Sequence, residues 1–111
     1  MGIEYALADD RKKRLFELGK GPWGHVFGRD DKLLFPSRAM LLAQVLAVMG
    51  QDPKLSGYWM RVAEKLWTFI DEAGGGTYVR LVNDTGYELI DLEDKGYQVV
   101  GTRYEAPVGE N

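Results

Sequence analysis

The chain of 111 residues contains no cysteine and only one histidine, His25. The lack of cysteine excludes disulfide bonds, thiolate zinc sites, iron–sulfur ligands and cysteine nucleophiles. One imidazole is a poor zinc cage, so we expect neither a metal site nor a cofactor. The fold must therefore be stabilised by its own hydrophobic core.

The chain also lacks a long hydrophobic run and an excess of basic residues. Residues 39–49, the longest mostly apolar stretch, fall far short of the roughly 20 residues that cross a bilayer. The net charge of −3 disfavours a nucleic-acid surface, which depends on clustered cations, and suits a basic partner better. The first residues do not resemble a secretory signal. We therefore expect a cytoplasmic protein that binds neither membranes nor nucleic acid.

What the chain does contain is a balanced composition. Hydrophobic residues make up 45% of it and charged residues 28%, which is typical of a chain that buries a core under a hydrated surface. Two cores would leave each half near the lower limit for unassisted folding. We predict a single α+β domain over residues 1–105 and a flexible C-terminal tail over residues 106–111.

The beginning of the chain predicts a hairpin followed by a loop. Apolar residues recur with a period of two over residues 3–8, which predicts a strand. Residues 15–18 can return antiparallel to it after a polar turn, and we interpret the basic run 11–14 as a hydrated part of that turn. Residues 19–35 are rich in glycine and follow neither period, so we predict an irregular loop.

Two helices are predicted in the middle of the chain. Ser37 is a good N-cap before strong helix formers, which predicts a helix over residues 38–49. Apolar residues surround most of this helix, so we expect neighbours to cover it on more than one side. A second, amphipathic helix ends at the glycines 74–76 and begins at either Asp52-Pro53 or Ser56.

Three strands are predicted after these glycines, over residues 77–83, 87–93 and 97–105, because short glycine-containing turns separate them. The element order is then ββααβββ. We predict an antiparallel sheet with two helices packed on one face, which buries the apolar side of each. We expect the first hairpin to join the later strands in one sheet, because an isolated hairpin is marginal in water.

The glycine-rich loop is one candidate site. Its glycines let backbone amides approach a ligand, and Lys20, Trp23 and His25 offer a charge, a stacking surface and a titratable ring. An aromatic residue in such a loop more often anchors the loop to the core, and no phosphate-loop pattern is present. A small-ligand module or minor enzyme with its site in residues 19–28 is therefore our alternative hypothesis.

The sheet face opposite the two helices is the other candidate site. Strand alternation leaves Tyr78, Arg80, Tyr97 and Arg103 as its polar and aromatic candidates. Tyrosine and arginine are enriched in protein interfaces. We therefore predict a small protein-interaction domain, rather than an enzyme, that binds a protein partner or forms a dimer. A bacterial inhibitor or immunity-type protein is a concrete version of this hypothesis.

Overall fold

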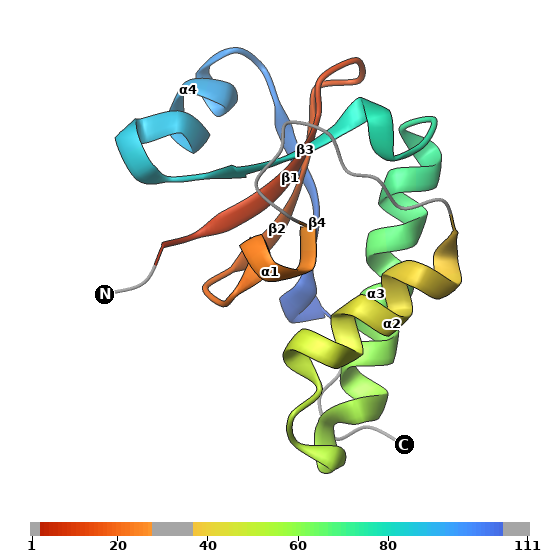
Figure 1. Ribbon diagram of the computed structural model, residues 1–111. Helices are drawn as coiled ribbons and strands as arrows, with labels where there is room; N and C mark the ends of the chain where they lie inside the picture. Colours follow the sequence, from red (N-terminus) through yellow and green to blue (C-terminus); the bar gives the residue numbers. More distant parts are fainter. Residues whose placement is uncertain (1–2, 28–36, 106–111) are drawn as a thin grey trace.

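The computed structural model describes residues 3–27 and 37–105, so the predicted tail over residues 106–111 lies outside the described part of the chain. The described residues form a single α+β domain in which helices pack on both faces of a mixed sheet (Figure 1). No helix in this part of the chain is long and apolar enough to cross a membrane. The strands are β1 (Tyr5–Asp9), β2 (Arg14–Gly19), β3 (Val79–Asn83) and β4 (Gln98–Thr102), and the helices are α1 (Trp23–Phe27), α2 (Arg38–Met49), α3 (Ser56–Glu72) and α4 (Glu88–Asp94).

The first hairpin forms the centre of the sheet, whose strand order is β3-β1-β2-β4. β1 pairs antiparallel with β2 and with β3, whereas β2 and β4 run parallel. The prediction that the hairpin joins the later strands in one sheet is confirmed, but this sheet has four strands rather than the predicted five. The prediction of a purely antiparallel sheet is wrong, because β3 and β4 run in the same direction at opposite edges. Such a pair needs a crossover connection, which α4 supplies.

Residues 87–93, predicted as a strand, form most of α4 instead. Gly86 and Tyr87 both adopt left-handed backbone angles, with φ of 69° and 68°, so the chain turns away rather than continuing a hairpin. Leu89 and Leu92 then recur at helical spacing and pack toward the sheet. The predicted meander is therefore replaced by a strand, a crossover helix and a strand.

The predicted helices lie where their capping signals place them. α2 spans the predicted range, and the Oγ of Ser37 accepts a hydrogen bond from the backbone N of Met40. Both predicted starts of the next helix are used, since Asp52 caps a 3₁₀ turn over Pro53–Leu55 and α3 begins at Ser56.

The loop predicted over residues 19–35 contains a short helix, α1, and its residues 28–35 lie outside the described part of the chain. The prediction of an irregular loop missed this turn of helix because a glycine-rich composition hides the apolar residues that anchor it. Trp23 and Phe27 stack with their ring centroids 6.1 Å apart, and both are buried. Tertiary packing thus orders a segment that has weak helix propensity.

The sheet separates two hydrophobic clusters. On one face, residues of α1, α2 and α3 pack against β-strand residues such as Leu7 and Phe16. On the other face, α4 places Leu92 over Ala6 and Ala8, whose small side chains allow the helix to approach the sheet. The prediction that two helices pack on one face holds for α2 and α3. The expectation that the opposite face stays open is corrected, because α4 covers part of it.

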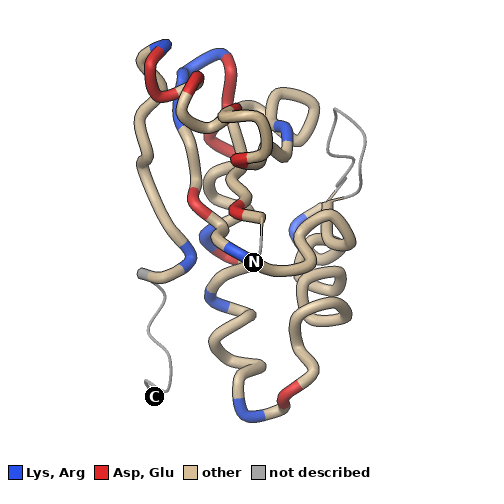
Figure 2. Tube along the Cα trace, turned by 90° about the vertical axis from the view of Figure 1, so that its left-hand side faces the viewer, with Lys and Arg blue, Asp and Glu red and all other residues tan. Residues whose placement is uncertain are grey.

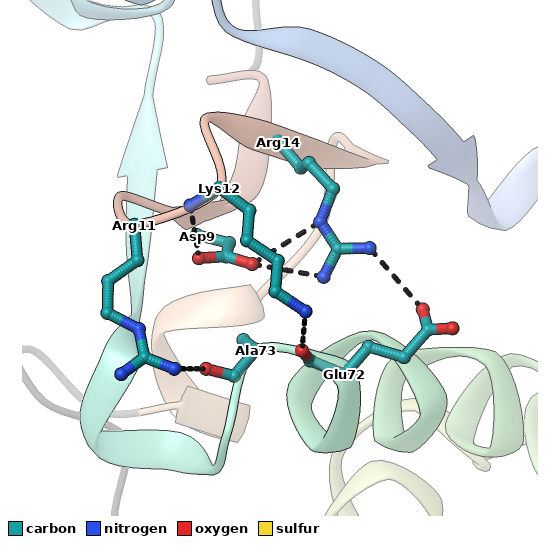
Figure 3. Close-up of polar contacts among 6 residues, drawn as sticks. All are labelled: Asp9, Arg11, Lys12, Arg14, Glu72 and Ala73. Atoms are coloured by element: carbon teal, nitrogen blue, oxygen red, sulfur yellow. Dashed lines mark hydrogen bonds and ion pairs between the residues drawn. The ribbon is translucent and has the colours of Figure 1, made fainter.

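The basic turn between β1 and β2 caps the C-terminal end of α3 (Figure 3). Arg11 Nη2 donates to the carbonyl oxygen of Ala73 at 3.1 Å, and Lys12 Nζ donates to that of Glu72 at 2.5 Å. Carbonyl groups at a helix C-terminus lack intrahelical partners and carry partial negative charge, so cations are stabilising there. Residues 11–13 form the exposed turn that the sequence predicts, and the turn also docks the hairpin on α3.

A fully buried carboxylate, that of Asp9, lies beneath this turn. It accepts hydrogen bonds from Arg14 Nη2 at 3.0 Å, from Arg14 Nε at 3.3 Å and from the backbone N of Lys12 at 3.2 Å. Arg14 Nη1 reaches Glu72 Oε1 of α3 at 3.4 Å. A buried charge is tolerated only when it is paired and hydrogen-bonded, so Asp9 fixes both the turn and the position of Arg14 against α3.

We expect Asp9→Asn to lower the free energy of unfolding by about 2 kcal/mol, because it weakens charge-assisted hydrogen bonds in a buried place. Urea unfolding followed by circular dichroism measures this loss. Glu72→Gln removes the exposed partner of the same arginine and should cost less than about 1 kcal/mol. Equal losses in the two variants would contradict the role given to burial of Asp9.

Candidate partner-binding groove

The structure buries one of the three loop candidates, Trp23, and exposes the other two, Lys20 and His25. Trp23 is fully buried in the larger core cluster, so its ring offers no surface on which a ligand can stack. Lys20 and His25 are exposed. Their carbonyl oxygens accept hydrogen bonds from Arg103 Nη2 at 3.3 Å and from Gln44 Nε2 at 2.9 Å, respectively. Ligand binding by the side chains of Lys20 and His25 stays a prediction.

Two of the sheet-face candidates, Tyr78 and Arg103, lie just outside β3 and β4, so strand alternation does not orient them. The guanidinium of Arg11 lies 3.9 Å from the centre of the Tyr78 ring. Arg103 donates from Nε to Leu18 O at 2.5 Å and from Nη1 to the hydroxyl of Tyr58 at 3.2 Å. Each side chain is thus engaged within the chain, at a different place on the molecule.

The other two sheet-face candidates, Arg80 and Tyr97, converge on a residue that the sequence did not single out, Asp10. Arg80 Nε donates to Asp10 Oδ2 at 2.8 Å, and the Tyr97 hydroxyl donates to Asp10 Oδ1 at 2.6 Å. Arg80 Nη1 also lies 3.7 Å from Glu88 Oε2. These contacts join the ends of β1, β3 and β4 to α4, which indicates a structural role for the pair.

This network shifts the pKa values of its members. Partial burial by itself raises the pKa of Asp10, but the hydrogen bonds from Arg80 and Tyr97 and the charge of Arg80 outweigh burial, so the pKa lies below its usual value. The hydrogen bond to the Asp10 carboxylate, followed by burial, raises the pKa of Tyr97. The hydrogen bonds of this network are therefore strongest at pH values above the pKa of Asp10 and below the pKa of Tyr97, where Asp10 is charged and Tyr97 is protonated.

A pH series tests the network through the stability difference between the wild type and Asp10→Asn. Because the pKa of Asp10 is lowered on folding, its contribution is fully present above about pH 4 and is lost as the pH falls through the folded-state pKa. The wild type should therefore be the more stable protein near neutral pH, and the difference should narrow in acid. Urea unfolding at successive pH values measures it. The control is Asp91→Asn, at an exposed carboxylate of α4, whose stability difference from the wild type should not narrow in acid. If the difference between the wild type and Asp10→Asn stays constant in acid, Asp10 does not stabilise the fold through its charge.

A groove of about 440 Å³ opens on the α4 side of the sheet, beside the start of β1. Ala6 and Ala8 of β1 face α4, and Glu4 precedes them at the same two-residue spacing, so its side chain lies on the same face of the sheet. The groove is the part of this face that α4 does not cover. Its lining residues are Glu4, Tyr5, Glu17, Asp84, Leu89, Ile90 and Tyr104.

The groove carries three carboxylates that have no cationic partner among the residues that the structure describes. Glu4, Glu17 and Asp84 take part in none of the ion pairs within residues 3–27 and 37–105. Asp84 Oδ1 accepts from the backbone N of Glu4 at 3.2 Å, and Glu17 Oε1 accepts from Thr102 Oγ1 at 2.9 Å. Within the described residues, no group of three or more acidic or histidine side chains is placed to hold a metal ion.

Apolar side chains form the walls between these carboxylates. Ile90 of α4 is 54% exposed and Tyr104, beyond β4, is 56% exposed. An aliphatic and an aromatic surface beside carboxylates suit a lysine or arginine side chain, whose stem is apolar and whose head is cationic. The guanidinium of Arg103 already lies 4.2 Å from the centre of the Tyr104 ring. The surface left for the stem of a partner's lysine or arginine is therefore Ile90 and the exposed part of that ring.

Tyr87, at the start of the groove-lining helix, has a strained backbone and an exposed ring. Its φ of 68° and ψ of 20° lie in the left-handed region, where a residue with a side chain is disfavoured by about 1–2 kcal/mol. The residue is 71% exposed, so no packing of its ring offsets this cost. Backbone strain concentrates at functional sites, and Tyr87 precedes the groove-lining residues Leu89 and Ile90 by two and three positions.

We expect Tyr87→Gly to raise the free energy of unfolding by about 0.5–1 kcal/mol, because relief of the left-handed strain exceeds the entropy cost of glycine. Tyr87→Ala removes the same ring but keeps the strain, so it should show no gain. Thermal and urea unfolding compare the two variants. If alanine stabilises the protein as much as glycine does, the strain is not located in the backbone of Tyr87.

Sequence reasoning predicted none of the residues that line the groove. They come from segments far apart in the chain, and α4, which supplies two of them, was predicted as a strand. The only available signal is the overall excess of 17 acidic over 14 basic residues, which indicates a basic partner but not its place. No protein-family model, curated protein or solved structure matches the chain, so the site rests on the geometry of its own residues.

Proposed function

We propose that the chain is a protein-interaction domain that binds a basic, partly apolar segment of a partner protein in the groove between β1 and α4. The observation that carries this proposal is the set of three carboxylates, Glu4, Glu17 and Asp84, that form no ion pair with the described part of the chain and lie beside exposed apolar walls. A partner's lysine or arginine would contribute the missing cation.

The chemistry of the walls favours a protein over a small metabolite as the occupant. Ile90 and Tyr104 are both more than half exposed, so the groove is open along its sides rather than closed around a compact molecule. Protein interfaces combine such exposed aromatic and aliphatic side chains with a polar rim.

An inhibitor that covers a cationic surface of an enzyme is a specific form of this proposal, and it retains the bacterial immunity-type role predicted from the sequence. An acidic surface speeds encounter with a basic partner and fixes the orientation of the complex. The alternative small-ligand site at residues 19–28 receives less support, because its stacking residue, Trp23, is buried.

A peptide of alternating lysine and leucine, labelled with fluorescein, tests the groove directly. We expect the wild type to bind it, and the double variant Glu4→Gln, Glu17→Gln to bind about tenfold more weakly, because two exposed ion pairs of up to about 1 kcal/mol each are lost. Glutamine keeps the shape of both side chains and an acceptor for Thr102. Fluorescence anisotropy measures the affinity, which should fall as salt is added.

The matched control is the double variant Glu93→Gln, Asp94→Asn, which removes two exposed charges elsewhere and leaves the same net charge. It should bind the peptide as the wild type does. An equal loss of affinity in both double variants would show that net charge, not the groove, attracts the peptide. Equal binding of a glutamate-leucine peptide would contradict the proposed charge complementarity.

A further inference from the structure

The outer edge of β4 is open in the part of the chain that the structure describes. β4 pairs with β2 on one side only, and its residues Val99 and Val100 are 52% and 49% exposed. The strand, Gln98–Thr102, contains neither a charged residue nor a proline. Figure 2 shows it at one side of the molecule, as the segment without blue or red that leads toward the C-terminal end. Edge strands that lack charge, proline and cover pair readily with another strand.

The opposite edge of the sheet, formed by β3, is occupied by contacts within the chain. At the end of β3, the backbone N of Asn83 donates to Glu88 Oε1 of α4 at 3.1 Å. At its start, the backbone N of Val79 donates to the carbonyl oxygen of Gly76. Arg80, between these two positions, places a charge on the strand. Features of this kind prevent an edge strand from pairing with another chain, so β4 is the edge that is open to a partner.

The pairing with β2 indicates which backbone groups of β4 face outward. The backbone N of Gln98 donates to the carbonyl oxygen of Lys13 at 3.0 Å, so Gln98 faces β2. Successive residues of a strand direct their N–H and C=O groups to opposite sides. Val99 follows directly and precedes the register shift of this pairing, so its N–H and C=O point away from β2. An extended backbone is the group that matches such donors and acceptors, so the occupant of this edge is a strand.

The two faces of the sheet differ in chemistry beside this edge. On the face that α4 covers in part, Thr102 Oγ1 donates to Glu17 Oε1 at 2.9 Å, and Glu17 lines the acidic groove. On the face that α2 and α3 cover, the ring of Phe16 lies against Gly101, where a Cβ atom would come within 2.9 Å of it. A strand added to β4 therefore lies beside a carboxylate on one face and beside an apolar surface on the other.

We propose that the basic, partly apolar segment of the partner binds as an added strand on β4, with its basic side chains on the face of the acidic groove and its apolar side chains on the other face. This inference rests on the proposed function of the groove and adds the conformation of the bound segment. Neighbouring strands lie about 4.8 Å apart, so the added strand lies about 10 Å from β2, a distance that a lysine and Glu17 span together. Alternation of basic and apolar residues is the pattern of such a strand.

Two substitutions at Val99 test strand addition with the labelled lysine-leucine peptide. Val99→Pro removes the outward N–H and places a ring at the edge, where proline is tolerated because this N–H does not pair within the sheet. We expect Val99→Pro to weaken peptide binding at least about tenfold. Val99→Ala keeps the N–H and shortens a half-exposed side chain, so its affinity should stay within about threefold of the wild type. Circular dichroism and thermal unfolding check that both variants keep the fold.

Backbone methylation of the peptide provides a second test, on the unaltered protein. Two peptides of the same sequence carry N-methyl groups either on the lysine residues or on the leucine residues. In an added strand, one of these sets of N–H groups faces β4 and the other faces solvent. We therefore expect one methylated peptide to bind at least about tenfold more weakly than the other, although the two carry the same charge.

The possible outcomes separate this inference from the proposed function. Peptide binding that depends on Glu4 and Glu17 but is equal in Val99→Pro and Val99→Ala, or equal for the two methylated peptides, supports the groove and overturns strand addition. A wild type that does not bind the lysine-leucine peptide overturns both. A wild-type dimer that Val99→Pro abolishes in sedimentation equilibrium, with peptide affinity unchanged, assigns the edge to a second copy of the chain and also overturns the proposal.

Discussion

The fold depends on one buried interaction, the contact of the Asp9 carboxylate with Arg14 under the β1–β2 turn. This pair holds the turn in a shape from which Arg11 and Lys12 reach the carbonyl groups at the end of α3. The central hairpin is thereby joined at one end to the longest helix, while Leu7 and Phe16 join it to the same helix layer through the core. Polar contacts at the turn and hydrophobic contacts in the core both join the β1–β2 hairpin to α3. Together they fix the position of the sheet against this helix.

The opposite face of the sheet follows from that arrangement. With one face filled by α1, α2 and α3, the crossover from β3 to β4 must pass over the other, and Ala6 and Ala8 leave room for α4 there. This helix of seven residues is too short to cover the whole face. The part beyond it, beside Glu4 and Glu17, stays open as an acidic groove. On α2, the residues buried by the described part of the chain are Leu41 and Val45, and the apolar residues on the opposite side of the helix are exposed.

The sequence predicts those parts of the structure whose residue patterns lie within a few positions of one another. The hairpin and α2 are predicted because the alternation of residues 3–8 and the cap at Ser37 act within a few positions. The class of fold follows from these elements. α4 is not predicted, because Leu89 and Leu92 fit a short strand as well as a helix, and the left-handed backbone of Tyr87 has no signal in the sequence. The groove depends on that crossover and on segments far apart in the chain. Only its acidic character can be predicted from composition.

Native-state hydrogen exchange is the most direct test of the claim that the Asp9 contact makes the hairpin and α3 one cooperative unit. Slowly exchanging amides of β1, such as that of Leu7, should open with the same free energy as amides in the centre of α3, such as that of Leu66, and both should match the free energy of global unfolding. If the amides of α3 instead open at a distinctly lower free energy than those of the hairpin, the helix unfolds by itself and the buried contact does not couple the two.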